Sequence, residues 1–123
     1  QWAEVIDARG LVVSAGLVDM HVHLREPGFE HKETIATGLA AAAAGGFTAV
    51  APMANTRPPI DSPEGIRFLL DKANQAGGAR LLPIAALTQG QKGQALTDPA
   101  GGDPLSKDGA FLYQRPIPKD CRP

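Results

Sequence analysis

The stretch Gly16-Leu17-Val18-Asp19-Met20-His21-Val22-His23-Leu24 is mostly apolar, with polar residues at alternate positions. Successive side chains of a β-strand point to opposite faces, so this pattern predicts a buried strand that carries functional groups on one side. His21 and His23 share that side with Asp19. The sequence therefore predicts a strand from which two imidazoles converge on one point.

Helices and strands are expected to alternate after this strand. The expected elements are a helix over 33–44 that stops at Gly45-Gly46, a strand over 47–52, a helix that opens at Asp61 or Ser62 with Pro63 in its first turn and ends at Gly77-Gly78, a strand over 80–87, a weakly helical stretch over 90–107 and a fourth strand over 109–113. Such an order predicts an α/β fold with a parallel sheet and right-handed crossovers.

The sequence around the first strand also bears on the type of α/β fold. No glycine-rich phosphate fingerprint follows that strand, which favours a (β/α) barrel over a dinucleotide-binding sheet. A full barrel takes about 250 residues, so a chain of 123 residues supplies about its first four strands. Residues 5–13 predict a short hairpin, the end of a small β-domain. We therefore expect a β-domain remnant over 1–15, a half-barrel over 16–117 and an unrelated or disordered tail over 118–123.

Composition excludes several classes of function. The chain is 43% hydrophobic and 20% charged with a formal net charge of -1, and its basic residues are scattered. This balance indicates a globular protein that binds neither nucleic acid nor a membrane surface. Cys121 is the single cysteine, so an internal disulfide is impossible and a cytoplasmic location is expected. Because the chain begins with Gln1, we expect an N-terminal segment to be missing.

The His21 and His23 pair has two interpretations. Imidazoles spaced in this way suit a divalent metal such as zinc, whereas the alternative is a pair of hydrogen-bonded core histidines. The pair ends the first strand of a parallel array, where barrel enzymes keep their catalytic groups, and this favours the metal. Arg25 could clamp a substrate carboxylate or form a surface ion pair with Glu26 or Glu30. Asn55 could bind an amide or carboxylate or merely form a turn.

Three further residues are weaker candidates for the site. His31 lies among charged residues after a Pro-Gly turn, and we expect it to be solvated at the entry of a helix. Asp19 could hydrogen-bond one of the paired histidines or only end the buried part of the strand. Cys121 has no histidine close to it in the sequence, which argues against a catalytic thiol.

Several motifs together resemble the dihydroorotases of the longer bacterial type, within the amidohydrolase superfamily. The stretch from Gly16 to Gly28 resembles the first metal motif of that family. The resemblance continues through Lys32-Glu33-Thr34-Ile35, Ala43-Ala44-Gly45-Gly46-Phe47-Thr48, Met53-x-Asn55-Thr56 and Gly93-Gln94-Ala95-Leu96-Thr97-Asp98. It covers the chain from about Glu4 to Tyr113, so the chain resembles an N-terminal fragment of such an enzyme.

This resemblance implies a zinc-dependent cyclic amide hydrolase on a distorted (β/α)8 barrel. The implied reaction is the interconversion of N-carbamoyl-aspartate and dihydroorotate in pyrimidine biosynthesis, with one or two divalent ions in the full-length protein. Carried over by position, His21 and His23 would bind metal, and Arg25 and Asn55 would hold the substrate carboxylate. The resemblance places no further catalytic residue within this chain. The partners left open are a homo-oligomer and another enzyme of the pathway.

The sequence departs from the family pattern at Ala54, where proline is common, and more seriously after residue 113. An Asp-Asp-Gly motif with a metal-bridging acid is expected there, but Gln114-Arg115-Pro116-Ile117 stands in its place. A competing alignment would use Asp108 as the acid, but it shortens the preceding helix and leaves the fourth strand unexplained. A frameshift, a premature stop or a gene-fragment origin would explain the departure. We therefore expect the chain alone to be incomplete and inactive.

Two other functions compete with this interpretation. A degenerate, non-catalytic scaffold subunit could share the fold, although the retained His21, His23, Arg25 and Asn55 argue against it. A hydantoinase or allantoinase relative would share the barrel and the histidine pair, but Leu24-Arg25-Glu26-Pro27-Gly28 together with the Asn55 motif favours dihydroorotase.

Overall fold

The computed structural model describes residues 3–98 and, for the backbone alone, residues 112–114. Its elements in chain order are β1 (Leu17–Val22), α1 (Ile35–Ala44), β2 (Phe47–Pro52), α2 (Pro63–Ala76), β3 (Arg80–Leu81), β4 (Ile84–Ala86), the 3-10 turn η1 (Gln89–Gln91) and β5 (Leu112–Gln114). Strands and helices alternate as expected through β3. In this part of the chain, no helix has both the length and the apolar character that a membrane crossing requires.

All strand pairs of the described chain are parallel. Strands β1, β2 and β3 form one sheet in that order, and β4 pairs with β5 in a second. The α/β class with a parallel sheet is therefore confirmed. The third strand, expected to be continuous, is split at Leu82-Pro83 into β3 and β4. Leu82 N still donates to Val50 O at 2.9 Å, but Pro83 has no N–H to continue the ladder.

Both helices begin and end where the sequence indicates. Thr34 caps α1 and forms a reciprocal capping box with Thr37, and Gly45 ends that helix. The Ser62 hydroxyl accepts from Gly65 N at the start of α2, and Pro63 occupies the first turn. Gly77 ends α2 with φ 69°, a conformation that favours glycine. These caps satisfy backbone groups that a helix end leaves without partners.

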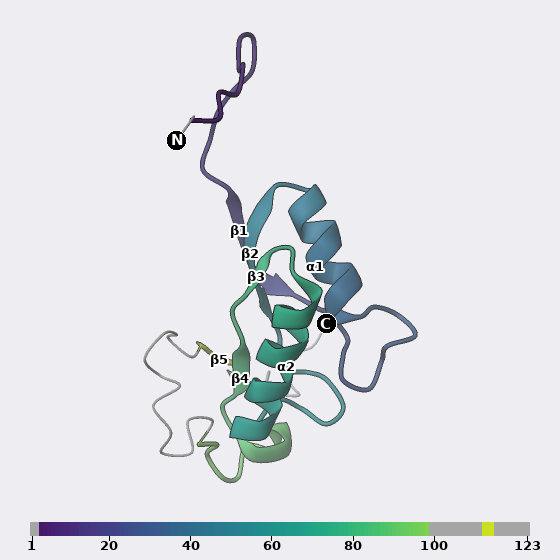
Figure 1. The fold of residues 1–123 in the computed structure, drawn as a ribbon. Coiled ribbons are helices and arrows are strands. Elements are labelled where there is room, and N and C mark those ends of the chain that lie inside the picture. Colours follow the sequence, from purple (N-terminus) through teal and green to yellow (C-terminus); the bar gives the residue numbers. More distant parts are fainter. Residues whose placement is uncertain (1–2, 99–111, 115–123) are drawn as a thin grey trace.

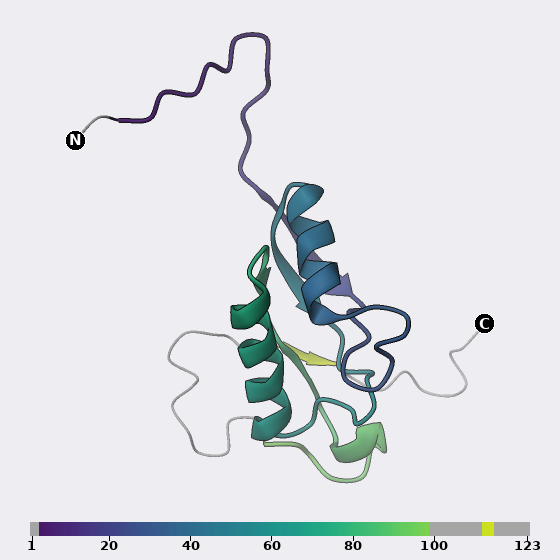
Figure 2. The ribbon, with the colours of Figure 1, turned by 45° about the vertical axis from the view of Figure 1, so that its right-hand side comes forward.

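The core lies between the helices and the sheet. Helices α1 and α2 lie side by side against the strands (Figure 1; Figure 2). The fully or nearly fully buried side chains are Ile35 and Leu39 of α1, Ile66 and Leu69 of α2, Val50 of β2 and Leu81 of β3. Burial of each such side chain stabilises the fold by roughly 1.5–3 kcal/mol before entropy is counted. The same contacts fix the strand ends that carry the polar residues.

The N-terminal segment differs from the expected hairpin. Leu11 N donates to Ala8 O at 3.0 Å and Gly10 has φ 79°, so the turn is present. No strand forms on either side of it within residues 3–16. The segment extends away from the rest of the molecule (Figure 1; Figure 2). Its apolar side chains, such as Val12 at 95% exposure, therefore contact little of the described chain.

The region after β4 also differs from expectation. The helical stretch predicted over 90–107 is wrong for its described part, which contains the single turn η1 and an antiparallel bridge between Thr88 and Leu96. Thr97 reinforces the bridge, because its hydroxyl donates to Ala86 O at 2.5 Å. The fourth strand is present as β5, paired in parallel with β4. Asp108, Cys121 and the predicted tail over 118–123 lie outside the described residues.

Candidate functional site

The two paired histidines lie at the carboxyl end of β1. His21 is inside the strand, and His23 directly follows its last residue, Val22. The ring centroids are 5.3 Å apart with an interplanar angle of 70°, so the rings meet edge to face. His21 is exposed and His23 is half-buried. Both imidazoles are therefore close together and open to solvent, as expected from their spacing.

The pairing of β1 with β2 brings Asn55 to the same place. Met53 N donates to Val22 O at 2.9 Å, which extends the parallel ladder past the ends of both strands. Two residues later, Asn55 Oδ1 lies 3.0 Å from His23 Nδ1. His21, His23 and Asn55 thus form one cluster, although they come from two different strand ends.

Arg25 follows the histidines in a strained turn. Its φ of 63° is in the left-handed region, and Glu26 N donates to Leu24 O at 2.7 Å across it. Among the described residues, no hydrogen bond or ion pair joins the Arg25 guanidinium to Glu26 or Glu30, so the expected surface ion pair is not formed. Nor does such a contact join it to the histidines or to Asn55. The structure thus places Arg25 in the loop beside the cluster but not in contact with it.

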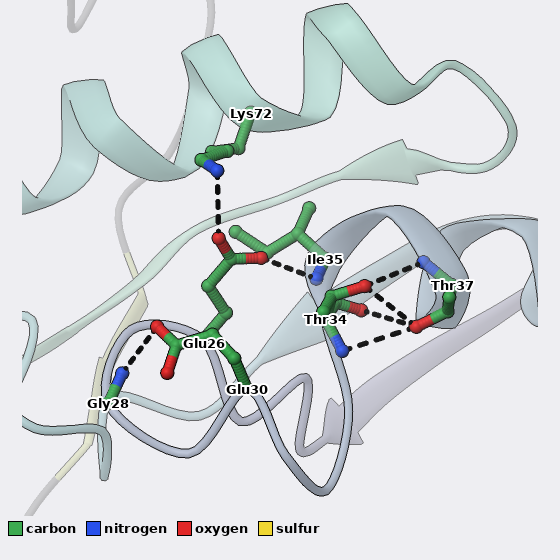
Figure 3. Close-up of polar contacts among 7 residues, drawn as sticks. All are labelled: Glu26, Gly28, Glu30, Thr34, Ile35, Thr37 and Lys72. Carbon is green, nitrogen blue, oxygen red and sulfur yellow. Dashed lines mark hydrogen bonds and ion pairs between the residues drawn. The ribbon is translucent and has the colours of Figure 1, made fainter.

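Glu26 is a residue whose importance the sequence did not reveal. It is 7% exposed, and its carboxylate joins three elements (Figure 3). Oε2 accepts from Ile35 N at the start of α1 at 2.9 Å, and Oε1 lies 3.0 Å from Lys72 Nζ of α2. The loop that carries Arg25 is therefore tied to both helices. A glutamate before a proline gives no sequence signal of burial, because its cation is distant in the chain.

The loops that follow β1 and β2 touch each other closely. Arg57 N donates to Pro27 O at 3.0 Å, and the Arg57 guanidinium carbon lies 5.9 Å from the centroid of the Phe29 ring. A Cβ atom on Gly28, which has φ 93°, would lie 2.2 Å from Arg57 O. Glycine is therefore required at this crossing. Both loops contain a cis X-Pro bond, Glu26-Pro27 in the first and Arg57-Pro58 in the second.

Charged groups near this crossing are held by the backbone. Gly28 N donates to the Glu30 carboxylate at 2.8 Å, and this hydrogen bond lowers the pKa of the exposed Glu30 side chain below its ordinary value. Lys32 Nζ lies 5.8 Å from the centroid of the Phe29 ring. The loop after β1 is thus ordered by its own polar contacts as well as by Glu26.

The remaining candidates lie apart from the cluster or touch it through the backbone. Asp19 Oδ1 accepts from His21 N at 3.0 Å, so it contacts the backbone rather than an imidazole ring. His31 is exposed in a turn ahead of α1, as expected. Across the residues that the structure describes, no three side chains of His, Cys, Asp or Glu come together as a metal-binding group. The described cluster therefore offers two imidazoles and one amide.

Comparisons with known proteins agree with this arrangement. The sequence model of the family described as "Dihydro-orotase-like" matches residues 10–116. The chain is 62% identical over 106 residues to a dihydroorotase of Brevibacillus brevis, which is 86% of this chain and 24% of that protein. It is 53% identical over 122 residues to a dihydroorotase of Caldanaerobacter subterraneus, which is 95% of this chain and 28% of that protein.

A third relative gives the same result. The chain is 54% identical over 95 residues to a dihydroorotase of Desulforapulum autotrophicum, covering 77% of this chain and 22% of that protein. The chain thus spans about a quarter of the length of the curated relatives that it matches. Identity at this level over most of the chain, together with the family match over residues 10–116, shows that the chain belongs to the dihydroorotase-like family.

Proposed function

We propose that this chain carries the first part of the active site of a metal-dependent dihydroorotase, which interconverts N-carbamoyl-aspartate and dihydroorotate in pyrimidine biosynthesis. The observation that carries the proposal is the cluster of His21, His23 and Asn55 at the carboxyl ends of β1 and β2. Catalytic groups of parallel α/β enzymes gather at that edge. The relatives of similar sequence are named dihydroorotases.

The two imidazoles suit a zinc ion. Two imidazoles that bind one tetrahedral ion at about 2.0 Å have ring centroids roughly 5 Å apart, and the centroids of His21 and His23 are 5.3 Å apart. When bound, one or two such ions would supply Lewis-acid polarisation of the amide. Catalytic zinc sites use three or more protein ligands, and the described residues bring together two imidazoles. The proposal therefore includes that the chain is inactive by itself.

Arg25 and Asn55 are proposed to hold the substrate carboxylate. The planar guanidinium of arginine matches a carboxylate with two parallel hydrogen bonds. Arg25 lies two residues after His23 and has no carboxylate partner among the described residues, so its charge is available. The amide nitrogen of Asn55 is a donor on the other side of the cluster. These two groups would orient an anionic substrate beside the metal.

The architecture is proposed to be the first half of a (β/α)8 barrel. Sequential order of parallel strands, as in β1-β2-β3 and β4-β5, supports a barrel because each strand pairs with the next one in the chain. Gln114 is the last residue of β5, where the family resemblance calls for a bridging acid. Residues 1–15 are proposed as a remnant of a small β-domain, 16–117 as the half-barrel and 118–123 as an unrelated tail.

A chimera tests the proposed activity. The 106-residue segment of the Brevibacillus brevis enzyme that matches this chain would be replaced by the corresponding segment of this chain. We expect dihydroorotate hydrolysis in the chimera and its loss in the His21→Ala and His23→Ala variants, with less bound metal in both. His31→Ala is the matched control, because His31 is exposed and outside the cluster. A folded chimera without activity, or one that prefers hydantoin or allantoin, would contradict the proposal.

The same assays on the purified 123-residue chain test its incompleteness. We expect neither stoichiometric metal nor turnover. Stoichiometric metal together with turnover that His21→Ala abolishes would show that the chain alone completes the site.

A further inference from the structure

Asn55 contacts the histidine pair as well as the solvent beside it. Its Oδ1 atom lies 3.0 Å from Nδ1 of His23, within hydrogen-bond distance. Asn55 is exposed, and His23 is half-buried. The contact joins the ends of two different strands, so it depends on the fold and not on local sequence.

The chemistry of this contact determines where His23 carries its proton. An amide oxygen has lone pairs and no hydrogen, so the histidine nitrogen must be the donor. His23 is then the tautomer with a proton on Nδ1, and its Nε2 atom keeps a free lone pair. A histidine that binds a metal through one ring nitrogen commonly donates the other N–H to an oxygen, which fixes both the tautomer and the ring orientation.

We propose that Asn55 is a positioning residue for His23: it holds Nδ1 protonated and so presents Nε2 to the metal. This inference rests on the proposed function and deepens it. The NH2 group of the same amide remains as a donor for a substrate carboxylate. One side chain thus links the carboxylate site to a metal ligand. A carboxylate bound at Asn55 would orient the amide and strengthen its hydrogen bond to His23 through polarisation.

Backbone contacts on both sides of the pair hold it in place. Met53 N donates to Val22 O at 2.9 Å, one residue before His23, and Arg57 N donates to Pro27 O at 3.0 Å, two residues after Asn55. The two loops are therefore connected in register before and after the contact. His23 and Asn55 need little further ordering to meet.

The tautomer of His23 in the metal-free 123-residue chain tests the proposal directly. The ¹⁵N chemical shifts of its ring nitrogens would be measured by NMR at about pH 8.5, where imidazoles with an ordinary pKa of about 6.5 are neutral. We expect the Nδ1–H tautomer at His23. In Asn55→Ala we expect a return to Nε2–H, the form that a free histidine side chain prefers. Nε2–H in the unaltered chain, whether the contact fails to form or the loops do not hold together, overturns the proposal.

Two further variants separate positioning from general damage. Asn55→Asp keeps an oxygen acceptor for Nδ1–H but removes the amide donors, so we expect it to keep the His23 tautomer. Asn74→Ala is the matched control, because Asn74 is exposed on α2 and the chain has no other asparagine. It should leave the tautomer unchanged. A change of tautomer in Asn74→Ala would show that the readout follows stability rather than the contact.

Metal affinity in the chimera gives a second readout that does not need turnover. We expect Asn55→Ala to weaken Zn²⁺ binding about 10- to 100-fold, as loss of a ligand's hydrogen-bond partner does elsewhere. Asn55→Asp should keep most of the affinity while raising the KM for dihydroorotate. Equal affinity in Asn55→Ala and the unaltered chimera would overturn the positioning role. The tautomer requires neither metal nor substrate, so failure of the proposed function is distinguishable from failure of this inference.

Discussion

Arg25 has a backbone conformation that costs free energy in any residue with a Cβ atom. Its φ of 63° lies in the left-handed region, where an L-residue is destabilised by about 1–2 kcal/mol. Residues in such conformations persist where surrounding contacts hold them, often at functional sites. The hydrogen bonds from Glu26 N to Leu24 O and from Phe29 N to Arg25 O surround this turn.

We expect Arg25→Gly to be more stable than Arg25→Ala by about 1 kcal/mol, because glycine adopts a left-handed φ without strain. Both variants lack the guanidinium, so their difference isolates the backbone. Urea unfolding of the two chains measures it.

Arg67 of α2 is the matched position for this comparison. There the order should reverse, with Arg67→Gly less stable than Arg67→Ala by about 1 kcal/mol, because glycine destabilises a helix interior. If alanine is the more stable residue at both positions, residue 25 is not held in a left-handed turn.

Glu26 is the second residue whose removal the structure makes testable. Its side chain is 8% exposed and that of Lys72 is 45% exposed, so the ion pair is partly screened. We expect Glu26→Gln to lower the free energy of unfolding by about 2 kcal/mol, between the values for exposed and fully buried pairs. Lys72→Met should have a similar effect.

The control for the loss of charge is Asp71→Asn, because Asp71 is exposed on α2 beside Lys72. It should change stability by less than about 0.5 kcal/mol. Equal effects of Glu26→Gln and Asp71→Asn in chemical denaturation would mean that the carboxylate of Glu26 does not hold the loop.

At the scale of residues, the sequence predicted what depends on local periodicity. His21 and His23 are adjacent because strand side chains alternate, and this needs no tertiary information. Asn55 was placed on the same rim from its position after a second parallel strand, and it lies there. The burial of Glu26 depends on Lys72 and on the start of α1, so no local pattern could reveal it.

The crossing of the loops after β1 and β2 is a property of elements, and Gly28 lies at its centre. In Gly28→Ala, a Cβ atom would meet Arg57 O at 2.2 Å and the residue would keep φ 93°. Because the obstacle is backbone, the loops must separate. We expect the free energy of unfolding to fall by roughly 3 kcal/mol or more, from strain and overpacking combined.

Gly46→Ala is the control for this substitution. Gly46 has φ 83°, but no atom lies within 4 Å of the position that its Cβ would take, so it reports backbone strain alone. We expect a loss of about 1–2 kcal/mol. Thermal unfolding of both variants measures the difference, and equal losses would mean that the two loops do not press on Gly28. The His23 tautomer should also change in Gly28→Ala but not in Gly46→Ala.

Elements were predictable where capping chemistry is explicit in the sequence. Thr34, Ser62 and the two Gly-Gly pairs mark the ends of α1 and α2 correctly. The third strand was predicted as continuous, but Pro83 interrupts its ladder. The stretch after η1 was predicted as helix, yet Thr88 and Thr97 bind backbone groups that bring residues 88 and 96 together. Side-chain competition of this kind is not visible in apolar periodicity.

The whole described molecule has an apolar edge. Strand β1 is the outer strand of the three-stranded sheet, and several of its side chains are exposed, with Met20 at 71%. The exposed apolar residues of the preceding segment are Val5, Ile6, Leu11, Val12 and Val13. An unpaired strand edge with apolar side chains is a template for association with another chain.

We therefore expect the purified 123-residue chain to self-associate through β1, and Met20→Lys to weaken that association. A lysine on an edge strand places a charge where a second strand would pair, while an exposed position costs the monomer little stability, about 0.5 kcal/mol or less. Sedimentation velocity over a range of concentrations measures the association, and urea unfolding checks the stability. Gln75→Lys on the exposed side of α2 adds the same charge away from the edge and should leave association unchanged. Equal weakening by both substitutions would show that net charge, rather than the β1 edge, controls self-association.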